Sequence, residues 1–533
     1  MASSRLFSGF PELANQILQY HKDDFSTLFS CTLVNRSLCR ITVPLLWENP
    51  FIITTRNYNF FKVYLQRLNN NDLMELGNVG IHIIPLNTLF NYPSFLKCLN
   101  ILSLKIQIER WTREYSNFNS SFAWSRVKLI YKLLFKIITN EATLHTFEIM
   151  LVEPRIVSCF NNSFVLFYQR TDFIRSVKNL KLIISHFDMN TDALLTLLSF
   201  KCNSIKNLRI EFNKKLNKSN ESNRVMLEKF SSDIINSHLN RITFDSNINH
   251  NLSLLKDSCS NNLRSIAFLR IDFSKINNFK EIMEHLNGLE FIDIMKCIID
   301  SNFSQQLISI NKQFKLRTLY IDDIYEIDSL KLLLQNFGNG LRNVIIGRKI
   351  NDEMDQELLE LMINFCKNIE YFNLEEFDKQ SIRTVCDLIK NVGESLCHLS
   401  INCNCNTILY QDDENIRNSS ELLQELGPVL PNRLEYFNLN LSINPVEFEN
   451  FLVKSNDTFI NDLMIENKLH ENSILPQIKE HLMKNKRIKN ISFDEGELSL
   501  FSRRNEVKEF KSHDICVFSG VELRIRNDRL LYD

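Results

Sequence analysis

The sequence predicts an α/β protein made of repeated strand–helix units, preceded by a small helical segment. The chain has 533 residues, which is too long for one compact domain and favours several domains or an elongated array. A short apolar motif recurs along most of the chain, and amphipathic helical patterns separate its copies. Residues 8–50 do not follow this repeat and have a helical pattern of their own.

Composition excludes several other classes of protein. The 62 basic and 63 acidic residues nearly balance, so charge gives no reason to expect nucleic acid or an anionic membrane as a partner. With 11 Gly and 10 Pro, the chain has too few turn formers for an all-β or a Gly-rich nucleotide-binding fold. Its 13 Cys have no framework spacing, and we find neither a signal peptide nor a membrane-length apolar run. We therefore expect reduced thiols and a cytoplasmic or nuclear location.

Residues 8–50 predict three short helices. Pro11 and Glu12 suit the first turn of a helix, and Ile17 and Leu18 follow at helical spacing. A second helix is expected after residues 23–24, and a third is expected to end at Pro44. A helical unit of roughly 40 residues is too small to bury its own apolar side chains fully. It is therefore expected to complete its core against a partner, or else to cap the repeat array.

The repeated motif is the triplet apolar-x-x-apolar-x-apolar. From Leu239 to Leu396 its successive first positions are 27, 23, 27, 25, 28 and 27 residues apart. This spacing is typical of leucine-rich repeats, whose units have about 20–29 residues. The fourteen copies begin at Leu99, Leu144, Val177, Ile205, Leu239, Ile266, Leu289, Leu316, Leu341, Ile369, Leu396, Leu434, Ile460 and Ile488.

Each triplet predicts a strand, and the stretch after it predicts a helix. Stacked side by side, such units form a curved solenoid with a parallel sheet on its concave face. We expect this array, of about 14 units, to cover residues 96–533. Residues 51–95 are expected to form a helical linker, with one helix around 60–68. The wide gaps after Leu99 and Leu396 predict insertions, the second with an exposed loop at 411–415.

No pattern in the chain indicates catalysis. We find no Gly-rich phosphate loop, no paired-histidine zinc motif and no nucleophile elbow. Cys403 and Cys405 are too closely spaced for a zinc knuckle, so we interpret them as core and loop cysteines. The basic run from Lys484 to Lys489 lacks interleaved aromatic residues and is interpreted as a solvated helix end. The sequence therefore predicts no enzyme, no cofactor and no metal.

Residues 10–47 resemble the F-box. The family pattern runs Leu-Pro-acidic-aliphatic, then an aliphatic pair and an aromatic residue or Leu, then Leu, then Val-Cys-Arg-x-Trp, then Leu-Trp. The matching residues here are Phe10-Pro11-Glu12-Leu13, Ile17-Leu18 with Tyr20, Leu28, Val34-Asn35-Arg36-Ser37-Leu38 and Leu46-Trp47. Phe10 stands where Leu is usual, and Leu38 where the family often has Trp. Residues 35–51, 91–95 and 144–149 are similar to a large fungal F-box family with leucine-rich repeats.

This resemblance implies a function without chemistry. F-box proteins dock on a Skp-type adaptor, which links them to a cullin scaffold and so to ubiquitin transfer. The repeats would then bind a substrate protein, whose lysine is brought close to the charged thioester. Two other classes stay open: a repeat scaffold or inhibitor that binds a protein without ubiquitination, and an enzyme with an unrecognised site. The residues expected to bind the adaptor are Phe10, Pro11, Leu13, Ile17, Leu18, Leu28, Val34 and Trp47.

The residue that follows each triplet is expected on the concave face, because alternate strand residues share a face. Seven of these fourteen residues are acidic. They could form an acidic floor that binds a basic segment of the substrate. Alternatively, they could cap N–H groups or pair with Arg209 and Arg270. The candidate substrate-binding residues are Glu211, Asp245, Asp272, Tyr320, Asp322 and Glu375.

Overall fold

The computed structural model divides into two compact units, Met1–Leu263 and Arg264–Asp533. Each unit is described by itself below. The residues that the structure describes are 11–20, 22, 25–51, 59–84, 88–114, 120–184, 189–212, 239–245, 262–276, 278–321, 327–347, 352–403, 413–469, 473–495, 498–518, 520 and 523–524.

The first unit begins with three short helices, α2 (Pro11–Tyr20), α3 (Phe25–Thr32) and α4 (Arg36–Leu46). The Asn35 side chain caps α4 by accepting a hydrogen bond from the Leu38 N–H at 2.8 Å. Pro44 was expected to end this helix, but α4 continues to Leu46. A proline in the last turn removes only one hydrogen bond, so the helix tolerates it there.

A helical segment joins α4 to the first strand. It contains α5 (Asn59–Leu65), which confirms the helix expected around 60–68, together with α6 (Asn70–Asn78) and the short η1 (Tyr92–Phe95). The Trp47 ring packs against Tyr92 and Tyr64, with centroids 4.2 and 5.8 Å apart. These aromatic contacts attach the three N-terminal helices to the α/β part of the unit.

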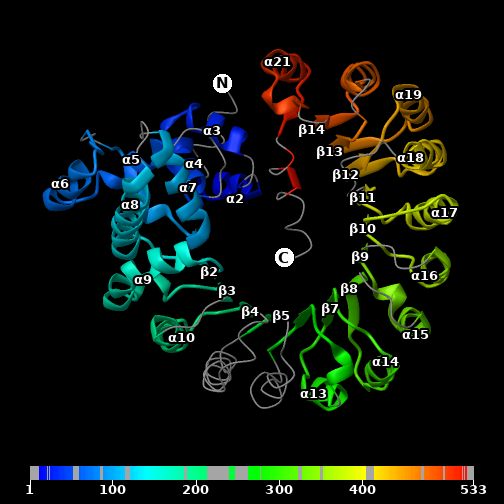
Figure 1. Ribbon diagram of the computed structural model, residues 1–533, viewed down its shortest axis with the longest axis horizontal. Helices are drawn as coiled ribbons and strands as arrows, with labels where there is room; N and C mark the ends of the chain where they lie inside the picture. Colours follow the sequence, from blue (N-terminus) through cyan, green and yellow to red (C-terminus); the bar gives the residue numbers. More distant parts are fainter. Residues whose placement is uncertain are drawn as a thin grey trace. The chain divides into compact units, whose positions relative to one another are not determined.

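Strands and helices alternate through the rest of the first unit. Adjacent strands from β1 to β5 are parallel. Helices α7 to α10 lie on one side of the strands (Figure 1). The elements are β1 (Cys98–Asn100), α7 (Ile101–Glu114), α8 (Ser120–Glu141), β2 (Thr146–Leu151), α9 (Pro154–Gln169), η2 (Asp172–Ile174), β3 (Asn179–Ile184), α10 (Met189–Lys201), β4 (Asn207–Phe212) and β5 (Arg241–Asp245).

The second unit repeats this alternation. It contains β6 (Ser265–Leu269), η5 (Phe273–Lys275), α13 (Phe279–His285), β7 (Phe291–Met295), α14 (Ser301–Ile308), β8 (Lys315–Ile321), α15 (Ile327–Phe337), η6 (Gly338–Gly340), β9 (Asn343–Ile346), α16 (Asp352–Phe365), β10 (Tyr371–Leu374), α17 (Ile382–Val392) and β11 (His398–Asn402). It continues with α18 (Asp413–Leu426), η7 (Gly427–Val429), β12 (Arg433–Leu441), α19 (Pro445–Lys454), β13 (Phe459–Asn467), α20 (Leu475–Gln477), η8 (Ile478–Met483), β14 (Ile488–Glu495), β15 (Leu498–Ser499), η9 (Leu500–Ser502), α21 (Arg504–Ser512) and β16 (Cys516–Val517).

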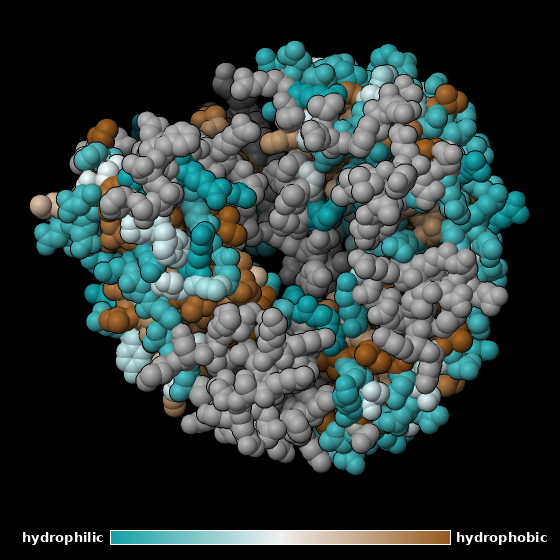
Figure 2. All heavy atoms as spheres, in the orientation of Figure 1, coloured by the Kyte–Doolittle hydropathy of each residue, from teal (hydrophilic) through white to brown (hydrophobic). Residues whose placement is uncertain are grey.

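Strands β6 to β14 are parallel and lie next to one another in chain order. Helices α13 to α19 cover one side of them (Figure 1). We call the opposite side of the sheet the inner face. The helix side carries mainly hydrophilic side chains over α17 and α18 (Figure 2). This α/β alternation, with every crossover made by a helix, is compatible with a repeat solenoid.

Strand registers place equivalent triplet positions side by side in most units. Phe372 of β10 pairs with Val344 on one side and with Leu399 on the other, all three at the second triplet position. Leu463 of β13 likewise pairs with Phe437 of β12. All of these side chains are buried on the helix side of the sheet. The predicted motif is therefore the core-forming part of each strand.

The predicted register is wrong by three residues in the first copy. Leu99 pairs with Phe147, a second triplet position, so this copy begins at the buried Leu96. Lys105 therefore lies in α7, not beside a strand. Its ammonium group pairs with Glu109 at 3.0 Å and with Glu153 at 2.5 Å.

The sixth copy is displaced in the same way. Ile266 pairs with Ile292, so the triplet begins at Leu263 and includes Phe268. Leu269, the second apolar residue of the predicted triplet, is only half-buried and pairs with Met295. Asp272 lies beyond the strand and precedes η5. Apolar residues occur at both sets of positions, so spacing alone could not choose the register.

The two expected insertions contain helices. The first gap holds α7 and α8, and the second holds α18. Residues 413–415 were expected in an exposed loop, but α18 already begins at Asp413. Acidic residues at its start suit the positive end of the helix. The remainder of that expected loop lies outside the described residues.

Gly338 marks a close approach between neighbouring repeats. It begins η6, directly after α15. A Cβ added to it would lie 2.8 Å from the carbonyl oxygen of Phe365 and 3.0 Å from the Phe365 Cβ. At Gly340, two residues later, the nearest atom to such a Cβ would be 3.6 Å away. The first glycine is therefore required by packing, and the second is not.

Arg487 is a buried cation at the entrance to β14. Its guanidinium donates to the carbonyl oxygens of Leu452 at 3.0 Å and Thr458 at 3.2 Å, and also to that of Ser455. Burial lowers its pKa from the ordinary value. The interpretation of the run 484–489 as solvated is thus wrong for Arg487, because its donors satisfy carbonyls in the last turn of α19 and just after it.

Candidate protein-binding surfaces

Helices α2, α3 and α4 share a small hydrophobic core. Leu18 of α2 and Leu28 of α3 are buried in it, together with Ala14, Leu38 and Leu45. Two of the residues expected to bind an adaptor, Leu18 and Leu28, therefore pack inside this helical group. Their helical spacing predicted an apolar face but could not decide which side of it faces inward.

The same helices expose a large apolar surface. Leu13 is 46% exposed, Ile17 40% and Val34 62%. Leu13 and Ile17 lie one helical turn apart on the outer side of α2. We define the α2–α3 apolar surface as the exposed residues Leu13, Ile17, Tyr20, Phe25, Phe29, Leu33 and Val34. Within this set Phe25 and Phe29 contact each other, with ring centroids 6.4 Å apart. Large exposed apolar surfaces of soluble proteins often mark sites that bind a partner.

Three residues expected to bind an adaptor remain, Phe10, Pro11 and Trp47. Phe10 lies outside the described residues, and Pro11 is the first residue of α2. Trp47 packs against Tyr64 and Tyr92, so it attaches the helices to the rest of the unit. Sequence analysis omitted Tyr20, Phe25, Phe29 and Leu33 from the site. Phe25 and Phe29 are spaced i,i+4 and so share one side of a helix. This spacing could have identified both residues as part of the site.

The inner face of the second unit is the other candidate surface. On β8 to β10 it carries Tyr320, which packs against Ile345 and Tyr371. The Tyr320 hydroxyl donates a 2.8 Å hydrogen bond to the Glu375 carboxylate, which brings two of the predicted substrate-binding residues together. The ammonium group of Lys296 lies 4.6 Å from the centroid of the Tyr320 ring.

Toward β14 this face becomes polar and acidic. The inner-face positions of β12 to β14 carry three acids and no base; they are Tyr436, Asn438, Asn440, Asp462, Met464, Glu466, Asn490, Ser492 and Asp494. Asn490 donates to Asp462 at 2.6 Å, and Asn438 donates to Ser400 of β11 at 2.9 Å. Glu466 and Asp494 belong to the seven acids that follow the triplets, but neither they nor Asp462 were among the candidate substrate-binding residues.

The predicted acidic residues do not form one continuous row. Glu211 of β4 is 3.7 Å from the Arg209 guanidinium, and Asp245 follows it on β5 in register. Asp272 accepts from Ser274 at 2.6 Å and pairs with Lys275 at 2.5 Å. Its burial acts to raise its pKa, but these donors outweigh it and the pKa is lowered. Asp272 thus serves local capping. Asp322 lies outside the described residues.

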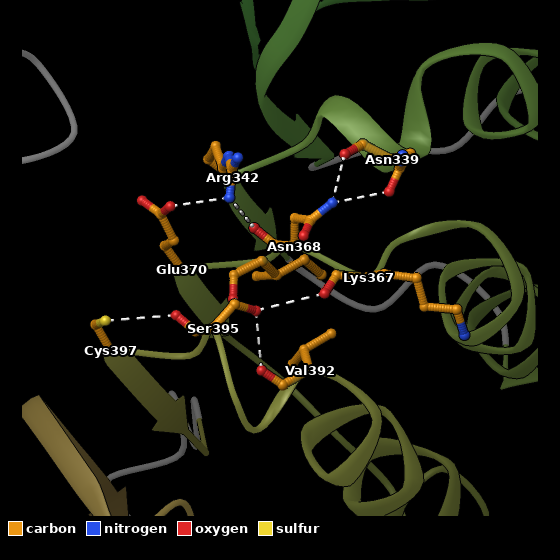
Figure 3. Close-up of polar contacts among 9 residues, drawn as sticks. Asn339, Arg342, Lys367, Asn368, Glu370, Val392, Ser395 and Cys397 are labelled. Carbon is orange, nitrogen blue, oxygen red and sulfur yellow. Dashed lines mark hydrogen bonds and ion pairs between the residues drawn. The ribbon is translucent and has the colours of Figure 1, made fainter.

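A cavity of about 340 Å³ lies at the edge of the second unit where turns lead into strands, lined by Phe314, Phe337, Arg342 and Asn368 among others. The Asn368 side chain donates to the backbone oxygen of Asn339 at 2.9 Å and to its side-chain oxygen at 2.8 Å (Figure 3). Arg342 in turn contacts Glu370 at 3.0 Å. These polar groups already hold successive turns together, so we assign the cavity a structural role.

The described part of the chain contains no group of three or more His, Cys, Asp or Glu residues placed to hold a metal ion. Cys405 lies outside it. Within the same residues, no helix combines the length and the apolar character needed to cross a bilayer.

Compared with protein-family models and with curated proteins, this chain gives no match.

Proposed function

We propose that this chain is the substrate-recognition subunit of a Skp–cullin–F-box type ubiquitin ligase. The observation that carries the proposal is the α2–α3 apolar surface. Three short helices with their own small core expose seven large apolar side chains, next to a long α/β array. The resemblance of residues 10–47 to the F-box supplies the partner, a Skp-type adaptor.

In this proposal the two parts have separate roles. The N-terminal helices bind the adaptor through the apolar surface, and the array holds a substrate protein. The chain itself performs no chemistry. Its contribution is to raise the local concentration of a substrate lysine near the ubiquitin thioester.

Charge reversal on α2 tests this proposal. Leu13 and Ile17 are both exposed, so replacing both with Asp leaves the small core in place. At a docked interface each would bury an unpaired carboxylate. With hot-spot costs of about 2 kcal/mol or more for each residue, the affinity for a recombinant Skp-type adaptor should fall by roughly a thousandfold. Isothermal titration or pull-down measures this loss.

The matched control is Val165→Asp with Tyr168→Asp. These residues are also exposed apolar side chains on one helix, α9, of the same unit. This variant should bind the adaptor like the wild type. Undiminished adaptor binding by the Leu13/Ile17 variant would refute the F-box assignment, and a protein-binding scaffold without ubiquitination would then be the better interpretation.

A further inference from the structure

The C-terminal segment leaves the edge of the sheet and crosses the inner face of the second unit. Strand β16 pairs with β14, and the Phe518 N–H then donates to the Ile491 carbonyl oxygen at 2.9 Å. Leu523 is fully buried, and it packs with Phe518 against Tyr436 and Met464. The segment therefore passes from β14 over β13 to β12.

The fit at Gly520 is close. A Cβ on this residue would lie 3.0 Å from a carboxylate oxygen of Asp494, 3.4 Å from Met464 Cε and 3.6 Å from Ser492 Oγ. A Cβ here would crowd the Asp494 carboxylate, while Met464 and Ser492 would lie at ordinary contact distances. A long, negatively charged side chain at this position would therefore meet the Asp494 carboxylate.

Polar groups near this segment still lack partners. Asn438 Oδ1, Asn440 Oδ1 and Asp494 Oδ1 are buried atoms without a hydrogen-bond partner, and Ser492 Oγ is another. Asn438 and Ser492 are themselves more than nine-tenths buried. Three of these four atoms are amide or carboxylate oxygens, which can only accept hydrogen bonds. A ligand that pairs with them must therefore supply hydrogen-bond donors. Buried acceptors left unpaired are costly, so such a ligand would gain affinity from them.

We propose that the segment containing Phe518, Gly520 and Leu523 is a tethered occupant of a peptide-binding strip, made of Tyr436, Asn438, Met464, Ser492 and Asp494. The external partner is a peptide that presents a large aliphatic side chain from a helical turn, as Leu523 does, beside arginine or lysine. The aliphatic group takes the place of Leu523, and the cation donates to the free acceptors. The inference depends on the proposed function in one respect only, namely that the external peptide belongs to the substrate protein.

The chain's own sequence has the same combination of groups. Leu523 is followed by Arg524, Arg526 and Arg529. The strip offers acidic and acceptor groups to such a sequence, so charge complementarity favours it. A tethered segment has an effective concentration on the order of 1 mM, so it competes strongly with a free peptide. The external partner therefore binds in competition with the tail.

A synthetic peptide of residues 514–533 tests this inference against full-length protein. The variant Gly520→Glu should displace the tethered segment, because its carboxylate meets Asp494, while every residue of the strip is unchanged. Fluorescence anisotropy should show the labelled peptide binding this variant at least tenfold more tightly than the wild type. Lys508→Glu, an exposed site on α21, is the control for added negative charge and should behave like the wild type.

Peptide variants test the chemistry of the strip. The Leu523→Asp peptide, and a peptide with its three arginines replaced by Glu, should both lose binding. Equal affinity for wild type and Gly520→Glu, or no binding to either, would overturn the inference. If circular dichroism shows that Gly520→Glu is unfolded, full-length Leu523→Asp takes its place, because it also releases the tail without altering the strip.

Adaptor binding separates this inference from the proposed function. Both tail variants should bind the adaptor like the wild type, because α2 and α3 are unchanged. If the wild type does not bind the adaptor but the Gly520→Glu variant binds the peptide more tightly, the ligase assignment is refuted and the inference about the strip stands. If the wild type binds the adaptor but the Gly520→Glu variant gains no affinity for the peptide, the inference about the strip is refuted and the ligase assignment stands.

Discussion

Arg487 should be one of the residues on which the stability of the second unit depends most. Its guanidinium donates to the carbonyl oxygens of Leu452, Ser455 and Thr458. Replacing Arg487 with Ala removes these three hydrogen bonds and a fourth to Ser455 Oγ. The Ser455 carbonyl still accepts from the Thr458 N–H, whereas the Leu452 and Thr458 carbonyls lose the guanidinium donor. A hydrogen bond to a charged group contributes about 1.5–3 kcal/mol, and such losses are not additive where water can enter. We therefore expect a destabilisation of roughly 3–5 kcal/mol.

Hydrogen exchange measures this loss where it occurs. Arg487 joins the end of α19 to the entrance of β14, so its loss should weaken β13 and β14 first. Since about 1.4 kcal/mol corresponds to a factor of ten, amide exchange in these two strands should accelerate by roughly a hundredfold to a few thousandfold. Arg487→Lys keeps the charge but loses the planar fork of donors, so it should give an intermediate effect.

Arg433→Ala provides the matched control. This arginine lies in the same unit, but its 2.9 Å ion pair with Glu435 is exposed. Exposed pairs contribute less than about 1 kcal/mol, so exchange should change by less than tenfold. If Arg487→Ala accelerates exchange no more than this control, the buried guanidinium does not hold the carbonyls, and the reasoning fails.

Two further predictions concern packing and pH. Gly338→Ala should destabilise the second unit by about 1–3 kcal/mol, because its Cβ meets the backbone of Phe365, while Gly340→Ala should be nearly neutral; comparing their thermal melts decides this. Burial lowers the pKa of His398 below its ordinary 6.5, although the carboxylates of Glu435 and Asp462 oppose this. The unfolded chain then binds the proton more readily, so stability is lost as the pH falls through 6.5 toward the lower folded pKa. His398→Phe keeps the ring between Tyr371 and Tyr436 and should lose less stability than the wild type between pH 7.5 and 5.5 in urea melts; equal losses would contradict this reasoning.

The recurring triplets predicted the α/β alternation well. Side chains at the second and third triplet positions, such as Phe372 and Leu374, pack against the helices and must therefore be apolar. The register failed where apolar residues also continue past the strand. Leu102 and Leu104 extend the spacing of the first copy, but they belong to α7. Only the pairing of Leu99 with Phe147 decides between the two registers.

The candidate sites were harder to predict, because the distinction between core and surface depends on tertiary packing. Leu13 and Leu18 both belong to the apolar pattern of α2, yet one is exposed and the other is buried. The three carbonyls that hold Arg487 come from the last turn of α19 and from the turn after it, and no sequence pattern marks this combination. The fit of Leu523 against Tyr436 joins residues far apart in the chain, and it could not be predicted from local spacing.

The short strands β15 and β16 both pair with β14, at its end and its middle respectively. A strand edge with free N–H and C=O groups is a template on which another chain can add its own strand. Covering β14 in this way therefore opposes edge-to-edge polymerisation of the protein. It follows that loss of residues 498–517 would not merely shorten the molecule. It would create an adhesive end, and light scattering would show concentration-dependent aggregates in place of a discrete species.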